Sequence, residues 1–160
     1  MVDVTAKSVT QRSAVAHVFV KMSPRVLAAM RKLENPKGDP LEVARIAGIS
    51  AAKRTSEWIP LCHPLPLTHI DVHPTVCKNG VEISTQVTAT AQTGVEMEAL
   101  VAAAAAALTV YDMCKALDKS IEIAELYLVE KTGGKSGDFR RADGRHKNRQ
   151  DQVTKRAPKR

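Results

Sequence analysis

The sequence predicts an α+β fold, an antiparallel sheet with helices packed on one face in a ferredoxin-like arrangement. Residues 13–22, 70–76 and 81–89 alternate between apolar and polar side chains, which is typical of half-buried strands. Two helical segments separate the first strand from the second, and a long alanine-rich segment follows the third. An apolar stretch at 121–130 completes the order strand, helix, helix, strand, strand, helix, strand, on which the prediction rests.

The first strand is expected at residues 13–22. Small and branched apolar side chains share one face there, while His17 and Lys21 point away. Half of the strand therefore faces the core, as expected for a sheet with one covered face. Pro24 then begins a helix that runs to about residue 33, because proline is tolerated in the first turn.

A second helix is expected from Pro40 to about Trp58. Asp39 is a suitable N-cap, and proline suits the first helical position that follows it. Three prolines within residues 60–66 then exclude regular structure, because they fix the backbone and remove hydrogen-bond donors. This segment is expected to be a stiff, extended loop.

Residues 70–89 are expected to form a β-hairpin. Asn79-Gly80 is a favoured two-residue turn between paired strands. Pairing about that turn places Val76 opposite Ile83, and the apolar faces of both strands then coincide. This coincidence supports the predicted register.

A long helix is expected after the hairpin. Residues 93–96 (Thr-Gly-Val-Glu) match a capping box, and the helical pattern continues to about Leu117. That is roughly 25 residues, or ~37 Å, which exceeds the diameter of a domain of this size. The unbroken alanine run 102–107 allows another helix to approach closely. We therefore expect a helix–helix contact between subunits.

Charge divides the chain into two parts, although 160 residues suffice for only one domain. The net charge is +7, yet residues 131–160 alone hold 11 Lys and Arg against 3 Asp and Glu. Residues 1–130 are therefore close to neutral, and the overall basicity does not indicate a nucleic-acid-binding domain. We expect a single catalytic domain over 1–139 and a basic, disordered C-terminal tail over 140–160.

Cysteine content and hydropathy indicate a cytoplasmic protein. Cys62, Cys77 and Cys114 are an odd, widely spaced set, which argues against a disulfide framework and for a reducing compartment. The N-terminus lacks a basic segment followed by an apolar one, so no signal peptide is expected. No apolar run reaches the ~18 to 20 residues of a membrane helix, so no membrane partner is expected.

Two short patterns are typical of ligand sites but are incomplete here. His69, His73 and Cys77 share one strand face, yet residues four apart on a strand are separated by ~13 Å. One metal ion cannot contact all three, so exposed polar residues are the simpler interpretation and no metal is expected. Residues 134–136 (Gly-Lys-Ser) lack the glycine that a phosphate loop needs at 129, but they suit a flexible, lysine-bearing lid over an anionic ligand.

Two other features are typical of acid–base chemistry. His63 in the stiff loop is either a general acid/base or an ordinary turn residue. Asp112 and Lys115 are either a catalytic pair or an ordinary helical ion pair. Glu98 lies on nearly the same helix face as Asp112 but ~21 Å away along the axis. Both can act on one ligand only if two antiparallel copies of the helix bring Glu98 of one subunit to Asp112 of the other.

Four longer motifs follow one another along the chain. They are Leu61-Cys62-His63-Pro64-Leu65, Thr93-Gly94-Val95-Glu96-Met97-Glu98-Ala99-Leu100, Tyr111-Asp112-Met113-Cys114-Lys115-Ala116 and Gly133-Gly134-Lys135-Ser136-Gly137-Asp138. In this order they resemble the cyclic pyranopterin monophosphate synthase family, the molybdenum cofactor biosynthesis protein C family. The resemblance covers about residues 1–139.

The resemblance implies a lyase of molybdenum cofactor biosynthesis. Its substrate would be 3′,8-cyclo-7,8-dihydroguanosine 5′-triphosphate, and its products cyclic pyranopterin monophosphate and pyrophosphate. Members of the family need no redox cofactor, so no cofactor is expected. The resemblance also implies a homohexamer, a trimer of dimers, in which each site lies between two subunits of a dimer.

Residue roles follow from the matching motifs. The resemblance assigns the catalytic acid–base pair to Asp112 and Lys115. The resemblance places basic side chains around the triphosphate, and Lys135 also fits there. It places residues 61–63 and 96–98 against the rest of the substrate. The implied substrate-binding residues are Arg12, Lys37, Leu61, Cys62, His63, Glu96, Met97, Glu98 and Lys131.

Two other classes of protein fit parts of the sequence. A binding module would use the basic tail to contact nucleic acid or another polyanion, with a steep dependence on salt. A zinc-dependent hydrolase would use His69 or His73 as a ligand. The enzyme is the leading hypothesis, with nucleic acid as a partner only through the tail.

Overall fold

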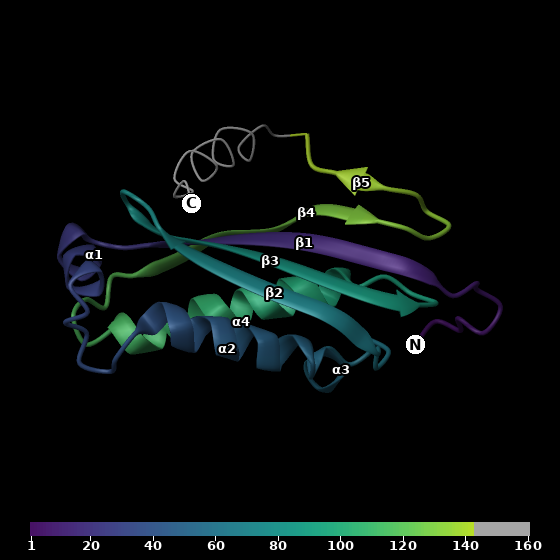
Figure 1. Ribbon diagram of the computed structural model, residues 1–160, viewed down its shortest axis with the longest axis horizontal. Helices are drawn as coiled ribbons and strands as arrows, with labels where there is room; N and C mark the ends of the chain where they lie inside the picture. The colour runs from purple at the N-terminus through teal and green to yellow at the C-terminus, as the bar shows by residue number, and fades with distance from the viewer. Residues whose placement is uncertain (143–160) are drawn as a thin grey trace, which may run out of the picture.

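The computed structural model describes residues 1–142 of the chain. Most of the predicted basic tail therefore lies outside the described residues. Within them, five strands form one antiparallel sheet in the order β2-β3-β1-β4-β5 (Figure 1). The strands are β1 (Thr10–Lys21), β2 (Leu67–Val76), β3 (Gly80–Ala91), β4 (Glu122–Thr132) and β5 (Phe139–Arg140).

Helices cover one face of this sheet, so the predicted α+β class is confirmed. α2 and α4 lie side by side across the sheet, and α1 lies at one end of it (Figure 1). The order β2-β3-β1-β4, with helices between β1 and β2 and between β3 and β4, is the ferredoxin-like arrangement. The helices are α1 (Pro24–Arg31), α2 (Pro40–Ala52), α3 (Thr55–Trp58) and α4 (Glu96–Cys114).

The hydrophobic core lies between the sheet and α4. The inward-facing side chains of β1 from Ala14 to Val20 are buried, as their alternation predicts. On its other side α4 packs against α2 at Gly48, where a Cβ would approach the carbonyl oxygen of Ala102 to 2.9 Å. The alanine run for which the sequence predicts an intersubunit contact is thus covered in part by α2 of the same chain.

α4 is shorter than predicted. It spans 19 residues and ends at Cys114, so its length is ~28 Å and does not by itself require a second subunit. The predicted capping box is also wrong, because Val95 is the N-cap and no side chain caps the helix. Glu96 instead forms an ion pair with Lys131 of β4.

Among the described residues, α4 is also the one segment long and apolar enough to cross a membrane. Its apolar side chains are mostly buried against the sheet and α2. Packing within the fold therefore accounts for its composition.

The predicted hairpin is present, but its register is wrong by two residues. Val76 pairs with Val81 rather than with Ile83. The shift is even, so the same side chains face the core and the apolar pattern cannot distinguish the two registers. Gly80 begins β3, where a Cβ would collide with the carbonyl oxygen of Val20 in β1. This glycine is therefore required for the close approach of two strands rather than for the turn.

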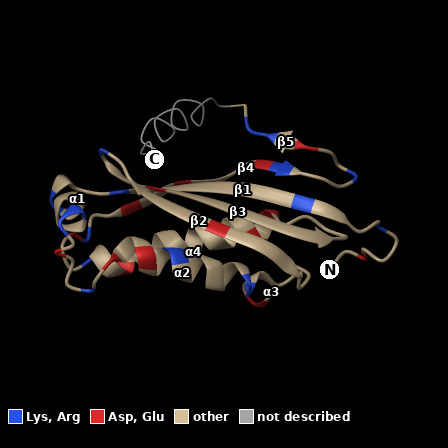
Figure 2. Ribbon diagram, in the orientation of Figure 1, with Lys and Arg blue, Asp and Glu red and all other residues tan. Residues whose placement is uncertain are grey.

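Other element boundaries also differ from prediction. The helix expected over 40–58 is divided into α2 and the single turn α3, which begins where the Thr55 hydroxyl donates to the Ala52 carbonyl at 3.0 Å. β1 begins earlier and β4 ends later than predicted, and β5 adds an edge strand. Figure 2 shows several charged residues on α1 and on the β4–β5 hairpin, whereas most of the central sheet is uncharged.

Candidate active site

The predicted site residues fall into two groups at opposite ends of α4. Glu98 near one end and Asp112 near the other are ~21 Å apart along the helix axis. The structure therefore does not bring the two groups together within one chain. The N-terminal group is Arg12, Leu61, Cys62, His63, Glu96, Met97, Glu98 and Lys131, and the C-terminal group is Lys37, Asp112 and Lys115.

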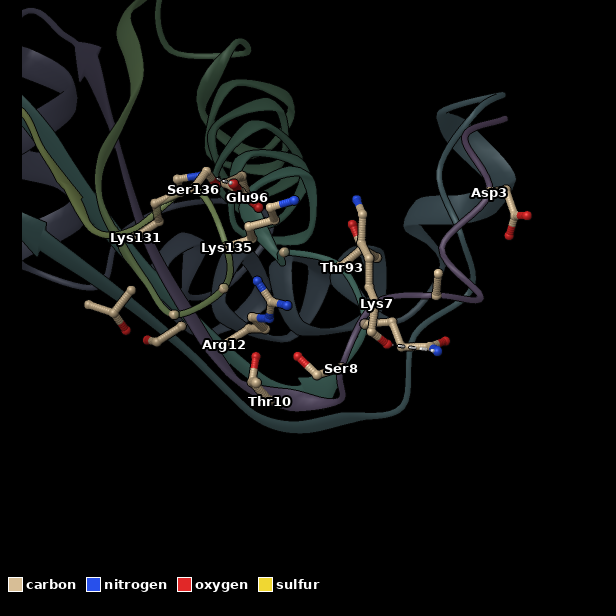
Figure 3. Close-up of a pocket in the computed structure, with 17 residues that line it drawn as sticks. Asp3, Lys7, Ser8, Thr10, Arg12, Thr93, Glu96, Lys131, Lys135 and Ser136 are labelled. Carbon is tan, nitrogen blue, oxygen red and sulfur yellow. Dashed lines mark hydrogen bonds and ion pairs between the residues drawn. The ribbon is translucent and has the colours of Figure 1, made fainter.

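A cavity of about 960 Å³ opens beside the N-terminus of α4. Four cationic and two acidic side chains line it, so it carries an excess of positive charge. Figure 3 shows Lys7, Arg12 and Lys135 reaching into the same space from the N-terminal segment, from β1 and from the loop after β4. A cavity with cations on several sides suits a polyanionic ligand.

Arg12 is the most enclosed of these cations, because only 8% of it is exposed. Its Nε donates to the carbonyl of Ala91 at 3.4 Å. Gly134 lies against its guanidinium with a φ of +89°, and a Cβ there would overlap Nη1. Glycine is therefore needed at 134 both for the left-handed backbone and for the space that Arg12 occupies.

Lys131 and Glu96 form an ion pair that joins β4 to the first turn of α4. The Lys131 Nζ lies 3.0 Å from Oε1 of Glu96 and donates to the Ser136 hydroxyl at 3.3 Å. Glu96 is favourably placed near the positive end of the helix dipole. An anionic ligand in the cavity would compete with Glu96 for the same ammonium group.

Glu98 is a buried carboxyl group beside the stiff loop at 61–63. Only 4% of the residue is exposed, and burial together with the nearby Glu96 charge raises its pKa to about 6. Burial and the charge of Glu98 also raise the pKa of the Cys62 thiol, so Cys62 lies close by and is not an activated nucleophile. Leu61, in the same loop, is exposed.

Replacing Glu98 with glutamine is expected to stabilise the folded protein at neutral pH. The pKa of Glu98 is about 6 in the folded state and 4.5 in the reference state, so folding favours the protonated carboxyl. Below pH 4.5 the group is protonated in both states. As the pH rises through 6, ionising the buried carboxyl removes up to ~2 kcal/mol of stability, which glutamine avoids.

Urea unfolding at pH 4.5 and pH 7.5 measures this effect. The free energy of unfolding of Glu98→Gln minus that of wild type should increase between the two pH values. Glu57→Gln is the control, because its carboxylate is exposed and pairs with Arg54 at 2.7 Å, so the substitution relieves no burial at the higher pH. A Glu98→Gln difference that does not change with pH would contradict the assignment.

Asp112 lies between two lysines at the other end of α4. Its Oδ1 is 2.6 Å from Lys115 Nζ, and its Oδ2 is 2.7 Å from Lys37 Nζ. Hydrogen bonds from Lys115 and Lys37 lower the pKa of Asp112 to about 2, and the same bond to Asp112 raises the pKa of Lys115. The two ammonium groups also stabilise a carboxylate that would otherwise be disfavoured at the negative end of the helix dipole. At neutral pH this group holds one carboxylate and two ammonium ions.

Lys7 lines the cavity, although no sequence pattern identifies it. It lies in an irregular segment before β1, where alternation and helical periodicity are absent. The Gln92 side chain fixes this segment by donating to the carbonyls of Thr5 and Lys7 at 3.3 and 3.2 Å. This contact, between residues far apart in the sequence, helps to hold Lys7 at the cavity.

The possible metal ligands of the hairpin do not gather. Within residues 1–142, no group of three His, Cys, Asp or Glu side chains is arranged to hold a metal ion. His69 and His73 pair with Thr88 and Ser84 across the strands, so the hairpin register brings neither of them to a second histidine or a cysteine.

A cation-lined cavity near a buried carboxyl group with a raised pKa is a candidate site for an enzyme that acts on small phosphorylated molecules. The profile of the MoaC family matches residues 1–134. The chain belongs to the MoaC family, which confirms the resemblance of the four motifs.

Similar proteins cover almost the whole chain, and those compared are named cyclic pyranopterin monophosphate synthase. The one from Staphylococcus aureus (strain JH9) is 52% identical over 149 residues, which cover 90% of this chain and 91% of that protein. The one from Heliobacterium modesticaldum is 54% identical over 145 residues, 89% of this chain and 91% of that protein. The one from Chloroflexus aurantiacus is 54% identical over 143 residues, 88% of each chain.

Proposed function

We propose that residues 1–139 form a catalytic domain that converts 3′,8-cyclo-7,8-dihydroguanosine 5′-triphosphate to cyclic pyranopterin monophosphate and pyrophosphate. This reaction belongs to molybdenum cofactor biosynthesis, and the enzyme is a phosphorus–oxygen lyase. One observation carries the proposal: a cation-lined cavity is present in a chain that is 52–54% identical to proteins named for this synthesis.

The cavity at the N-terminus of α4 supports binding of the triphosphate. Arg12 can bind phosphate oxygens in a bidentate manner, and Lys7, Lys131 and Lys135 add charge from other sides. When the cyclic phosphate closes, a substrate hydroxyl attacks the α-phosphorus and the bond to pyrophosphate breaks. The same cations stabilise the negative charge that develops on the leaving pyrophosphate.

The group at the C-terminus of α4 supports proton transfer. Lys115 is an ammonium ion beside Asp112, so it enters the reaction as a general acid and becomes a base only after donating its proton. Asp112 holds the lysine in place and stabilises its charged form. Rebuilding the purine ring system requires protons to be moved at several atoms, which a lysine can do without a metal ion.

A complete site is proposed to combine the N-terminal group of one subunit with the C-terminal group of another. The ~21 Å between Glu98 and Asp112 prevents one small substrate from reaching both within a chain. Asp112 also lines a largely apolar groove of about 450 Å³, whose residues Trp58 and Leu108 are 52% and 54% exposed. A second subunit covering this groove would bury both side chains and complete the site. The homohexamer of the resemblance, a trimer of dimers, provides such a neighbour.

The purified protein should release one pyrophosphate for each molecule of cyclised nucleotide that it consumes. Phosphorus NMR distinguishes pyrophosphate from orthophosphate and follows the cyclic phosphate of the product. GTP that has not been cyclised is the matched control and should not react. Orthophosphate as the product, or turnover that a metal chelator abolishes, would contradict the proposal and favour a metal-dependent hydrolase.

A further inference from the structure

The loop between α1 and α2 carries Lys37 but has little regular structure to hold it. Leu33 has a φ of 57° and Gly38 a φ of +89°, so the backbone turns sharply twice. Every residue from 32 to 39 is exposed except Asn35, of which only 7% is exposed. The position of this loop therefore depends heavily on one buried polar side chain.

Asn35 makes two side-chain hydrogen bonds that face different parts of the fold. Its Oδ1 accepts from the backbone N–H of Lys37 at 3.0 Å. Its Nδ2 donates to the sulfur of Cys114 at 3.3 Å. The orientation of the amide follows from chemistry, because a backbone N–H can only donate and must therefore face the oxygen. Cys114 is fully buried at the last residue of α4, so Asn35 joins the loop to the end of that helix.

The ion pair of Lys37 needs this support. Lys37 Nζ donates to Oδ2 of Asp112 at 2.7 Å and to the Asp112 carbonyl at 3.1 Å. Both side chains are about half exposed, and exposed ion pairs of this kind contribute little by themselves. A lysine side chain is also flexible, so its ammonium group stays in place only if its backbone is held.

We propose that Asn35 is a positioning residue that holds Lys37 against Asp112 by anchoring the backbone at residue 37 to the buried end of α4. This inference rests on the proposed function, in which Lys37 and Asp112 belong to the site. Asn35 does not contact Asp112 itself and acts through Lys37.

The Asn35→Ala variant of the full chain tests this role without substrate. Carbon-detected NMR titration of the Asp112 carboxyl group reports its pKa, which is about 2 when both lysines are in place. The variant should raise this pKa toward that of an ordinary aspartate, because a displaced Lys37 no longer favours the carboxylate. Thr85→Val is the control: it removes another buried side-chain hydrogen bond, at 2.8 Å to Ala99, ~20 Å from Asp112 along α4.

Turnover provides a second measurement. Asn35→Ala should lower kcat by about tenfold to a hundredfold, as expected for a displaced site group. The double variant Asn35→Ala/Lys37→Ala should be no slower than Lys37→Ala alone, because Asn35 acts through Lys37. If Asn35→Ala does not fold, Asn35→Ser keeps an acceptor for the Lys37 N–H but cannot reach Cys114, and a smaller rise in the Asp112 pKa is expected.

The outcomes separate this inference from the proposed function. An Asp112 pKa that is unchanged in the folded Asn35 variant overturns the positioning role, as does a change of equal size in Thr85→Val. If the Asp112 pKa rises while kcat is unchanged, Asn35 does hold Lys37 in place. That result would instead contradict the proposed role of Lys37 in the reaction.

Discussion

The Lys115→Ala variant is expected to lose turnover by about a thousandfold while still binding substrate. The cations proposed to bind the triphosphate line the cavity at the other end of α4, so the substitution leaves them in place. It removes the lysine whose Nζ lies 2.6 Å from Asp112 Oδ1, and with it the proposed general acid. Rapid quench of pyrophosphate release measures the rate, and calorimetry with the cyclised nucleotide measures binding.

Two further variants separate proton transfer from charge. Lys115→Arg keeps a cation near Asp112, but a guanidinium does not give up its proton in this pH range, so it should be nearly as slow as alanine. Lys119→Ala removes an exposed lysine four residues further along the chain, beyond the end of α4, and should retain wild-type turnover. Undiminished activity in Lys115→Ala would refute the catalytic assignment.

Mixing two inactive variants is expected to restore activity. Arg12→Ala damages the N-terminal group and Asp112→Asn the C-terminal group, so each homogeneous oligomer has only damaged sites. In a mixed dimer one site carries both substitutions and the other carries neither. Random exchange of equal amounts should therefore recover about a quarter of wild-type activity, if each dimer has two shared sites.

The control for this experiment pairs two variants of the same group. Arg12→Ala mixed with Lys131→Ala leaves one substitution in every site, so no recovery is expected. Subunit exchange is verified independently with differently tagged chains. If Arg12→Ala and Asp112→Asn subunits exchange but activity is not restored, the shared site is excluded. Full activity in a protein shown to be monomeric would also exclude it.

The strands and the fold class were predictable because burial of one sheet face leaves alternating residues in the sequence. The hairpin register was not, because a shift of two residues keeps Val76 on the same face. The end of α4 at Cys114 was missed for a different reason. The residues after it, Lys115 to Leu117, favour a helix by themselves, so tertiary contacts rather than propensity determine where it stops.

Most of the proposed site residues lie in local motifs, whereas Arg12, Lys37 and Lys131 were inferred from the wider resemblance. The separation of Glu98 from Asp112 followed from helix geometry. Lys7 and Asn35 were not predictable, because neither belongs to a periodic pattern. Their positions depend on side-chain contacts with Gln92 and Cys114, residues more than seventy positions away. Contacts of this kind leave no mark in a short stretch of sequence.

α4 carries Glu98 of one group and Asp112 of the other on one rigid helix of 19 residues, and this constrains which insertions and deletions the sequence can accept. Exchanging one small residue for another in the middle of the helix leaves the relative orientation of its two ends unchanged. Inserting or deleting a single codon there would rotate one end against the other by about 100° and displace it by about 1.5 Å. In an assembly of twofold symmetry the same error would arise at both shared sites at once. The number of residues between Glu98 and Asp112 is thus more tightly constrained than the identity of the residues between them.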